Sequence, residues 1–184
     1  MQSFFDWFSV NSVVKNRSWL ILGKGPSFSR LVDFDVSQYI TLSLNHAVRE
    51  RVVDVAHIID FDVVEHCGEA LLCNASVLVM PWHPHMRNKA SSKNLEEMAR
   101  GHPILERLRN EGRLLWYNLS TSKDHRSGAP VVRVKYFSAE AALNLLATAG
   151  VRCVRSLGVD GGASYSAAFS DLSDKTLLAN IRTS

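Results

Sequence analysis

Six short apolar runs, separated by polar or helix-forming stretches, constrain the fold of this 184-residue chain more than any other feature. The runs are Trp19–Leu22, Ile40–Leu44, Val55–Ile59, Val77–Met80, Leu114–Tyr117 and Cys153–Leu157. Short runs with few or no charges are typical of strands that are covered on both faces. Strands that alternate with helices form a parallel sheet between two helical layers. We therefore predict an α/β fold: a Rossmann-like, doubly wound, mainly parallel sheet with helices on both faces.

Helices are predicted in two of the stretches between these runs. Asn94–Asn110 has helical spacing, with a break expected at Gly101-His102-Pro103. Ala139–Ala149 follows Ser138, which is a good N-cap residue, and precedes a glycine, which is a good helix stop. Residues 121–130 are rich in turn-forming types and predict the clearest flexible loop.

Composition predicts one buried domain rather than two, because 184 residues make one domain of ordinary size. Apolar residues make up 46% of the chain and charged residues 21%, as in globular proteins. The net charge of +3 suits a phosphate-bearing small ligand and does not indicate nucleic acid as a partner. Three cysteines lie in apolar segments, and their odd number favours free thiols and a cytoplasmic location.

The beginning of the chain is rich in aromatic residues. Residues 1–16 are predicted to form an amphipathic helix ahead of a single nucleotide-sugar-binding domain formed by residues 17–184. Asp6 and the lack of a basic start argue against a signal peptide. The aromatic face is expected to pack on its own domain or on a partner domain. Peripheral contact with the inner face of the cell membrane is the alternative.

A glycine-rich turn, Gly23-Lys24-Gly25-Pro26-Ser27, follows the first apolar run. Glycines let the backbone approach a ligand closely, and Pro26 and Ser27 favour the start of a helix. Free N–H groups and the helix dipole at such a start favour an anion. The turn therefore predicts a site for a phosphorylated ligand, such as a nucleotide or a nucleotide-sugar. An ordinary strand-to-helix turn is the alternative.

This turn does not match the two best-known phosphate motifs. A dinucleotide-binding fingerprint has a glycine where Phe28 stands, and an acid about 20 residues further on, where Asn45 stands. A P-loop has serine or threonine after its lysine, whereas Lys24 is followed by Gly25. Neither an NAD site nor a P-loop ATP site is favoured.

Polar residues also follow other predicted strands, at the edge where parallel sheets bind ligands. Asn45 can contact a phosphate, a base edge or a ribose, or it can cap a helix. Asp160 follows Gly158 and can accept hydroxyl groups, act as a base or nucleophile, or form an Asx-turn. Tyr165 comes shortly afterwards and is expected to reach a phosphate.

Two histidines, His83 and His85, follow the fourth run. A general base or a phosphate contact is the functional interpretation, and a surface loop without a role is the alternative. A metal site would need a third ligand, and the cysteines lack the spacing of a zinc site. No metal is therefore predicted.

Four motifs occur in the order found in one family. They are Ile21–Ser27, Leu42–Asn45, Ser138–Gly150 and Ser156–Gly161. From about Trp19 to Gly162 the chain resembles the bacterial sialyltransferases and the related motility-accessory-factor and pterin-diphosphokinase-like proteins. The resemblance implies a glycosyltransferase of bacterial surface glycan synthesis whose donor is a CMP-linked acidic sugar, sialic acid or Kdo. It implies a glycan acceptor as the second partner, and no metal or other cofactor.

The resemblance also implies the donor site. The glycine turn would lie at the nucleotide phosphate, Asn45 near phosphate and sugar, Ser138 at the donor, and Asp160 near the cytidine ribose. The residues predicted to bind the nucleotide are Gly23, Gly25, Pro26, Ser27, Asn45, Ser138, Gly158, Asp160 and Tyr165.

The chain departs from this family in its candidate base. The family's catalytic histidine lies beyond the last motif, and this chain has no histidine after His125. Asp160, His83 and His85 are the predicted catalytic substitutes, and an aspartate nucleophile would give a retaining mechanism. A donor-site fragment of a longer transferase, a pterin diphosphokinase-like phosphotransferase and a non-catalytic nucleotide-binding module are the alternatives.

Overall fold

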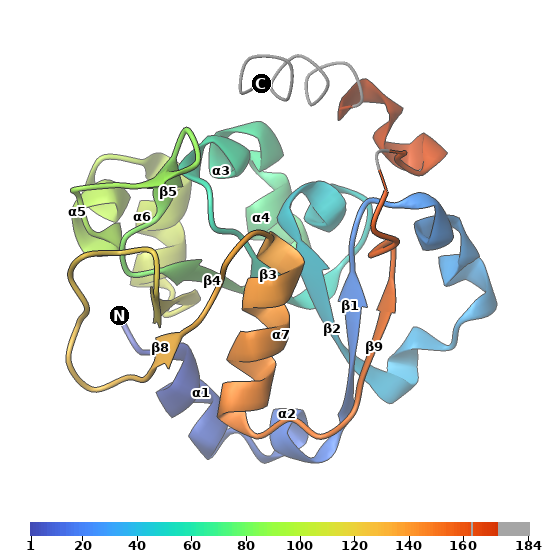
Figure 1. Ribbon diagram of the computed structural model, residues 1–184, viewed down its shortest axis with the longest axis horizontal. Helices are drawn as coiled ribbons and strands as arrows, with labels where there is room; N and C mark the ends of the chain where they lie inside the picture. Colours follow the sequence, from blue (N-terminus) through green and yellow to red (C-terminus); the bar gives the residue numbers. More distant parts are fainter. Residues whose placement is uncertain (163, 173–184) are drawn as a thin grey trace.

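A seven-stranded parallel sheet lies at the centre of the computed structural model, which describes residues 1–162 and 164–172 (Figure 1). The strand order is β8-β7-β4-β3-β2-β1-β9. The strands are β1 (Ser18–Leu22), β2 (Tyr39–Leu44), β3 (Val53–His57), β4 (Ala75–Pro81), β7 (Leu114–Leu119), β8 (Val131–Val132) and β9 (Val154–Leu157). All six predicted strands are present, and the predicted α/β class with a parallel sheet is confirmed.

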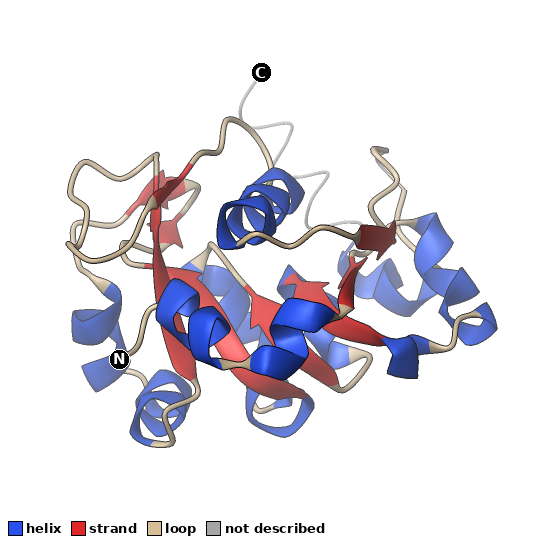
Figure 2. Cartoon of the chain, turned by 90° about the horizontal axis from the view of Figure 1, so that it is seen from below, coloured by secondary structure: helices blue, strands red, loops and turns tan. Residues whose placement is uncertain are grey.

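Helices cover both faces of the sheet (Figure 2). One layer holds α1 (Phe4–Val10), α2 (Ser12–Asn16) and α7 (Ser138–Ala149). The other holds α3 (Phe61–Cys67), α4 (Ala70–Asn74), α5 (Leu95–Arg100), α6 (Pro103–Asn110) and the 3₁₀ helices η1 (Pro26–Asp33), η3 (Asn45–Arg49) and η4 (Ala167–Leu172). A further 3₁₀ turn, η2 (Val36–Gln38), precedes β2. Successive β1 residues enter opposite cores, Leu20 one and Ile21 the other, which is why the predicted strands carry so few charges.

The N-terminal segment forms two helices rather than the single helix predicted for residues 1–16. Asn11 ends α1 and caps α2, with its side chain accepting a hydrogen bond from the Val14 amide at 3.4 Å. The aromatic face packs on the protein's own sheet: Phe4 and Phe8 are buried against Trp19, with ring centroids 6.4 and 6.2 Å away. Within the described residues, no helix is long and apolar enough to cross a membrane.

The helix of residues 94–110 breaks where predicted, giving α5 and α6. Ser138, in contrast, is the first residue of α7 and not its N-cap; Phe137 holds that position and has no side-chain capping bond. Glu140 instead accepts hydrogen bonds from the Lys135 and Tyr136 amides, at 3.1 and 3.0 Å. The prediction of Ser138 as the cap is wrong because this carboxylate organises the loop before the helix.

The short hairpin of β5 (His85–Met86) and β6 (Lys89–Ala90) has no clear signal in the sequence. Its turn residues, Arg87 and Asn88, have φ values of 51° and 62°, as a two-residue type I′ turn requires. Neither residue is the glycine that usually marks such a turn. The two-residue strand β8 is likewise too short to be recognised from an apolar pattern.

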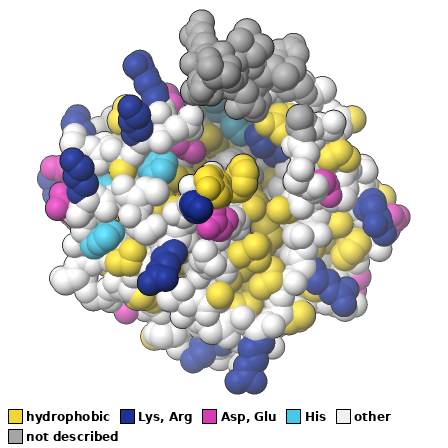
Figure 3. Space-filling view, viewed as in Figure 1, with side chains coloured by type: hydrophobic (Ala, Val, Ile, Leu, Met, Phe, Trp, Pro, Cys, Tyr) yellow, Lys and Arg dark blue, Asp and Glu magenta, His cyan; other side chains and the backbone are white. Residues whose placement is uncertain are grey.

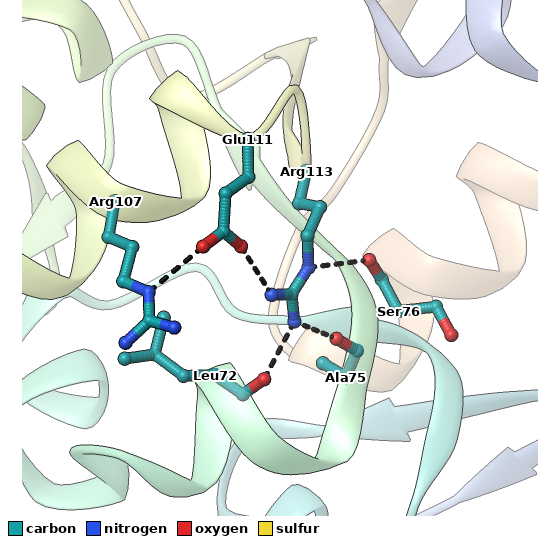
Figure 4. A network of polar contacts seen from close by, with 6 residues as sticks. All are labelled: Leu72, Ala75, Ser76, Arg107, Glu111 and Arg113. Carbon is teal, nitrogen blue, oxygen red and sulfur yellow. Dashed lines mark hydrogen bonds and ion pairs between the residues drawn. The ribbon is translucent and has the colours of Figure 1, made fainter.

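One arginine joins the amino-terminal ends of two neighbouring strands (Figure 4). The Arg113 guanidinium, just before β7, donates to the carbonyls of Leu72, Ala75 and Ser76 at 2.8, 2.5 and 3.0 Å. Glu111 accepts from Arg113 at 2.6 Å and from Arg107 of α6 at 2.9 Å. The network fixes the edge of the sheet that lies opposite the carboxyl ends of the strands.

The path of the chain reverses beside β1. From β1 the strands are added in one direction as far as β8, and α7 then returns the chain to β9 on the other side of β1. The loops after β1 and β9 therefore leave the sheet in different directions. In open parallel sheets this switch point opens a crevice at the carboxyl ends of the strands, where ligands bind.

Candidate functional site

A cleft of about 810 Å³ lies at this switch point, between the loops after β1, β2 and β9 and the start of α7. It brings together residues that lie more than 140 positions apart in the sequence, from Gly23 to Tyr165. Of the predicted nucleotide-binding residues, those lining the cleft are Gly23, Gly25, Asn45, Ser138, Gly158, Asp160 and Tyr165. Pro26 and Ser27 lie outside its lining.

The glycines of the turn after β1 pack against the loop after β9. The Gly23 amide donates to the Leu157 carbonyl and the Gly25 amide to the Gly158 carbonyl, both at 2.8 Å. A Cβ on Gly23 would lie 2.2 Å from the Gly158 oxygen, and one on Gly158 would lie 2.3 Å from the Gly23 oxygen. Both glycines are therefore required by the contact of the two backbones, whatever a ligand requires.

Asp160 occupies the start of η1, where the sequence predicted an anion. Its carboxylate accepts hydrogen bonds from the Ser27 amide, at 2.9 Å, and from the Ser27 hydroxyl. The Ser27 oxygen in turn accepts from the Gly158 amide at 2.7 Å. A carboxylate of the chain itself thus interacts with the positive end of this helix. The amide and hydroxyl of Ser27 are already engaged.

This contact gives a stability prediction for Asp160→Ala. Removing a carboxylate that caps a helix start usually costs about 1 kcal/mol. We expect a loss of this size in the free energy of unfolding, measured by urea denaturation. Asp124→Ala is the matched control, since Asp124 is an exposed loop acid with no helix start to cap. Equal stability of the two variants would contradict a capping role for Asp160.

The start of α7 forms a second, open helix terminus in the cleft. Phe137 caps it without a side-chain hydrogen bond, and Ser138, Ala139 and Glu140 line the cleft. The Asn45 amide nitrogen lies 3.4 Å from the Ser138 hydroxyl oxygen. The Asn45 side-chain oxygen is buried and has no hydrogen-bond partner among the described residues.

Asn45 has a left-handed backbone, with a φ of 51°. Asparagine tolerates this conformation better than most residues, although it still costs of the order of 1 kcal/mol. Strain of this kind often accompanies functional sites, where it fixes a side chain in one direction. Here it holds the Asn45 amide beside the first turn of α7.

Lys24 adds a positive charge to this end of the cleft. Its ammonium group lies over the Tyr165 ring, 4.5 Å from the ring centroid. No carboxylate of the described chain forms an ion pair with Lys24, whereas the nearby Arg49 pairs with Asp171 at 3.0 Å. Lys24 is thus held by an aromatic ring and keeps its charge for an anion.

Behind Lys24, His46 is buried and both of its ring nitrogens lack a partner within the described residues. Burial, followed by the charges of Lys24, His66 and Arg49, lowers the pKa of His46 to about 4. His46 is therefore neutral at pH 7 and adds no charge to the cleft. The positive potential there comes from Lys24 and from the start of α7.

The opposite wall of the cleft is apolar. Phe137 is 70% exposed, Leu143 44% and Val159 36%, which is unusual for large apolar side chains that lie next to one another. Figure 3 shows apolar side chains gathered over this part of the molecule, beside α7. The cleft therefore joins a polar, positively charged end to an apolar surface, as sites for small organic ligands do.

His83 and His85 do not join this cleft. They line a second cavity of about 540 Å³, together with residues of the β5–β6 hairpin and the loop after β7. The two cavities share no lining residue among those described. The histidines follow β4, which lies three positions from β1 in the sheet. The predicted catalytic group of Asp160, His83 and His85 is therefore divided between two places.

Lys24 and the apolar wall are the parts of the cleft that the sequence did not predict. Lys24 was considered only as a P-loop lysine, although a lone charge inside the glycine turn was itself a signal. Phe137, Leu143 and Val159 were missed because an exposed apolar residue cannot be distinguished from a core residue in a single sequence.

The candidate carboxylates for a metal, Asp60 and Asp62, do not line the switch-point cleft. Among the residues that the structure describes, no group of three His, Cys, Asp or Glu side chains is arranged to hold a metal ion. Cys67 is buried, and burial raises the pKa of its thiol to about 12. Cys73 and Cys153 are exposed free thiols.

Comparison of the chain with protein-family models, with curated proteins and with solved structures gives no match in any of the three. A function for the chain must therefore be inferred from the geometry of the two cavities and from the motifs of the sequence.

Proposed function

We propose that the switch-point cleft binds a nucleotide-activated sugar, and that the chain is a glycosyltransferase or the donor-binding domain of one. The observation that supports this most is the combination, in one cleft, of Lys24, the uncapped start of α7 and an apolar wall. A phosphate suits the first two, and a base or sugar ring suits the third.

The start of α7 is a better phosphate site than the start of η1. Asp160 already fills the latter, and a second anion there would be repelled. At α7, the helix dipole, Lys24 and the Asn45 amide act on the same end of the cleft. The phosphate therefore lies closer to Ser138 than to Ser27 in our proposal.

The kind of nucleotide is inferred from the order of the four sequence motifs. The resemblance to bacterial sialyltransferases favours a CMP-linked acidic sugar, and a glycan of the bacterial surface as acceptor. Free thiols at Cys73 and Cys153 suit a cytoplasmic reaction. With Asp60 and Asp62 outside the cleft, the geometry gives no separate support for a pterin diphosphokinase-like reaction.

Calorimetry with CMP, UDP, ADP and GDP tests the proposal. We expect binding of CMP in preference to the other three. Lys24→Ala should weaken CMP binding about tenfold, or about 1.4 kcal/mol, because the phosphate loses a charge-assisted contact. The matched control is Lys15→Ala, since Lys15 is an exposed lysine of α2 outside the cleft. Failure of the folded protein to bind any of the four nucleotides would overturn the proposal.

A further inference from the structure

The second cavity contains a histidine with a carboxylate on one side and a hydroxyl on the other. His85 Nε2 lies 2.8 Å from Thr121 Oγ1, within hydrogen-bond distance. His85 Nδ1 lies 4.0 Å from Asp60 Oδ1, at the limit of an ion pair. The three residues come from the loops after β3, β4 and β7. None of the switch-point residues takes part.

The backbone holds Asp60 and His85 together. The two residues form a parallel β-bridge, and the His85 amide donates to the Ile59 carbonyl at 2.8 Å. Their side chains are only 23% and 14% exposed, so neither moves freely in solvent. The β5–β6 hairpin begins at His85 itself and ties its chain direction to the turn at Arg87.

This arrangement favours one tautomer of the imidazole. A carboxylate beside Nδ1 favours a proton on that nitrogen, which leaves the lone pair on Nε2. Nε2 then accepts the hydrogen bond from the Thr121 hydroxyl. Burial lowers the pKa of His85, which keeps the ring neutral and able to accept a proton near pH 7.

Thr121 is exposed at the surface of the cavity, so a ligand can reach the position of its hydroxyl. Lys89, Lys123 and Asp124 surround this position and offer polar contacts of both signs. A cavity of about 540 Å³ is large enough for a small polyhydroxylated molecule. Sugar hydroxyls are the ligand groups that such a set of side chains would recognise.

We propose that this cavity is the acceptor site, where an acceptor sugar hydroxyl replaces that of Thr121 and His85 Nε2 takes its proton, with Asp60 as the positioning residue. The inference rests on the proposed function. In the transfer step, the acceptor oxygen forms a bond to the anomeric carbon of the donor. The bond from that carbon to the phosphate oxygen breaks, CMP leaves with the electron pair, and the acceptor proton remains on His85.

The sheet places the two sites along one edge. Asn45 follows β2, Asp60 follows β3, and these strands are neighbours in the sheet. Neighbouring strands lie about 4.8 Å apart. A donor whose phosphate lies near Asn45 can therefore direct its sugar towards the side of the sheet where Asp60 and His85 lie.

The tautomer of His85 provides a test that needs no turnover. In ¹⁵N-labelled protein at pH 7.5, two-dimensional spectra of the imidazole rings should show His85 protonated on Nδ1 and unprotonated on Nε2. Asp60→Asn should lower the fraction of that tautomer. A His85 ring protonated on Nε2 in the wild-type protein would overturn the inference, whether or not the switch-point cleft binds CMP.

Turnover provides the second test, with CMP-N-acetylneuraminic acid as donor and water as acceptor, followed by CMP release. His85→Ala should lower kcat about 100-fold, and Asp60→Asn about tenfold with an unchanged KM. His125→Ala is the matched control, an exposed histidine outside both cavities, and should leave kcat unchanged. Wild-type kcat in the His85 and Asp60 variants would overturn the inference, whereas absence of CMP binding in calorimetry would instead overturn the proposed function.

Discussion

Gly158→Ala should destabilise the protein by about 3 kcal/mol, the sum of two separate effects. The φ of Gly158 is +72°, a conformation that costs an alanine of the order of 1 kcal/mol. The new Cβ would also lie 2.3 Å from the Gly23 carbonyl oxygen, which is backbone and cannot rotate away. Forcing the two loops apart adds about 2 kcal/mol, as other overpacked contacts do. Chemical denaturation measures the sum.

Gly112→Ala is the control that separates the two effects. Its φ of +70° nearly equals that of Gly158, and nothing lies within 4 Å of the position that the new methyl group would take. We expect a loss of about 1 kcal/mol there, from the backbone alone. If Gly158→Ala were no more destabilising than Gly112→Ala, the close contact of the β1 and β9 loops would be contradicted.

Lowering the pH from 7 to 4.5 should weaken the fold through its buried histidines. Burial lowers the pKa of both His46 and His57 to about 4. Above pH 6.5 each is neutral in the folded and the unfolded chain. As the pH falls further, the unfolded chain takes up protons that the folded one excludes, so the free energy of unfolding decreases. Complete titration corresponds to about 3 kcal/mol for each histidine.

Urea denaturation at pH 7 and pH 4.5 measures this loss. His57→Gln removes one titrating group and keeps an acceptor for the Tyr117 hydroxyl, which lies 2.9 Å from His57 Nε2. The variant should lose about half of the pH dependence. Burial raises the pKa of Asp60, which acts in the opposite direction and offsets part of the effect. Equal stability at the two pH values would contradict the burial of His46 and His57 as neutral rings.

The fold was predictable because burial leaves a local pattern. A strand covered on both faces must be apolar at successive positions, as Trp19–Leu22 is, and this can be read without knowing its neighbours. Caps and turns were less predictable because several residue types can serve them. Glu140 replaces the cap expected of Ser138, and Arg87 and Asn88 form a turn usually marked by glycine.

The site was predictable only in part, because sequence does not give the order of strands in a sheet. The carboxyl ends of β1, β2 and β9 were expected to carry ligand-binding residues, and Asn45 and Asp160 do lie there. That Asp160 would engage Ser27, 133 positions away, has no local signal. Nor does the separation of His83 and His85 from Asp160, which depends on β4 lying three positions from β1.

The most direct measurement is to map CMP on the labelled protein by ¹H–¹⁵N correlation spectra. Binding at the switch point should shift the amide signals of Lys24, Asn45, Ser138 and Ala139 and leave those of His83 and Lys89 in place. Shifts confined to the second cavity, or no shifts at millimolar CMP, would contradict a nucleotide site between β1, β9 and the start of α7.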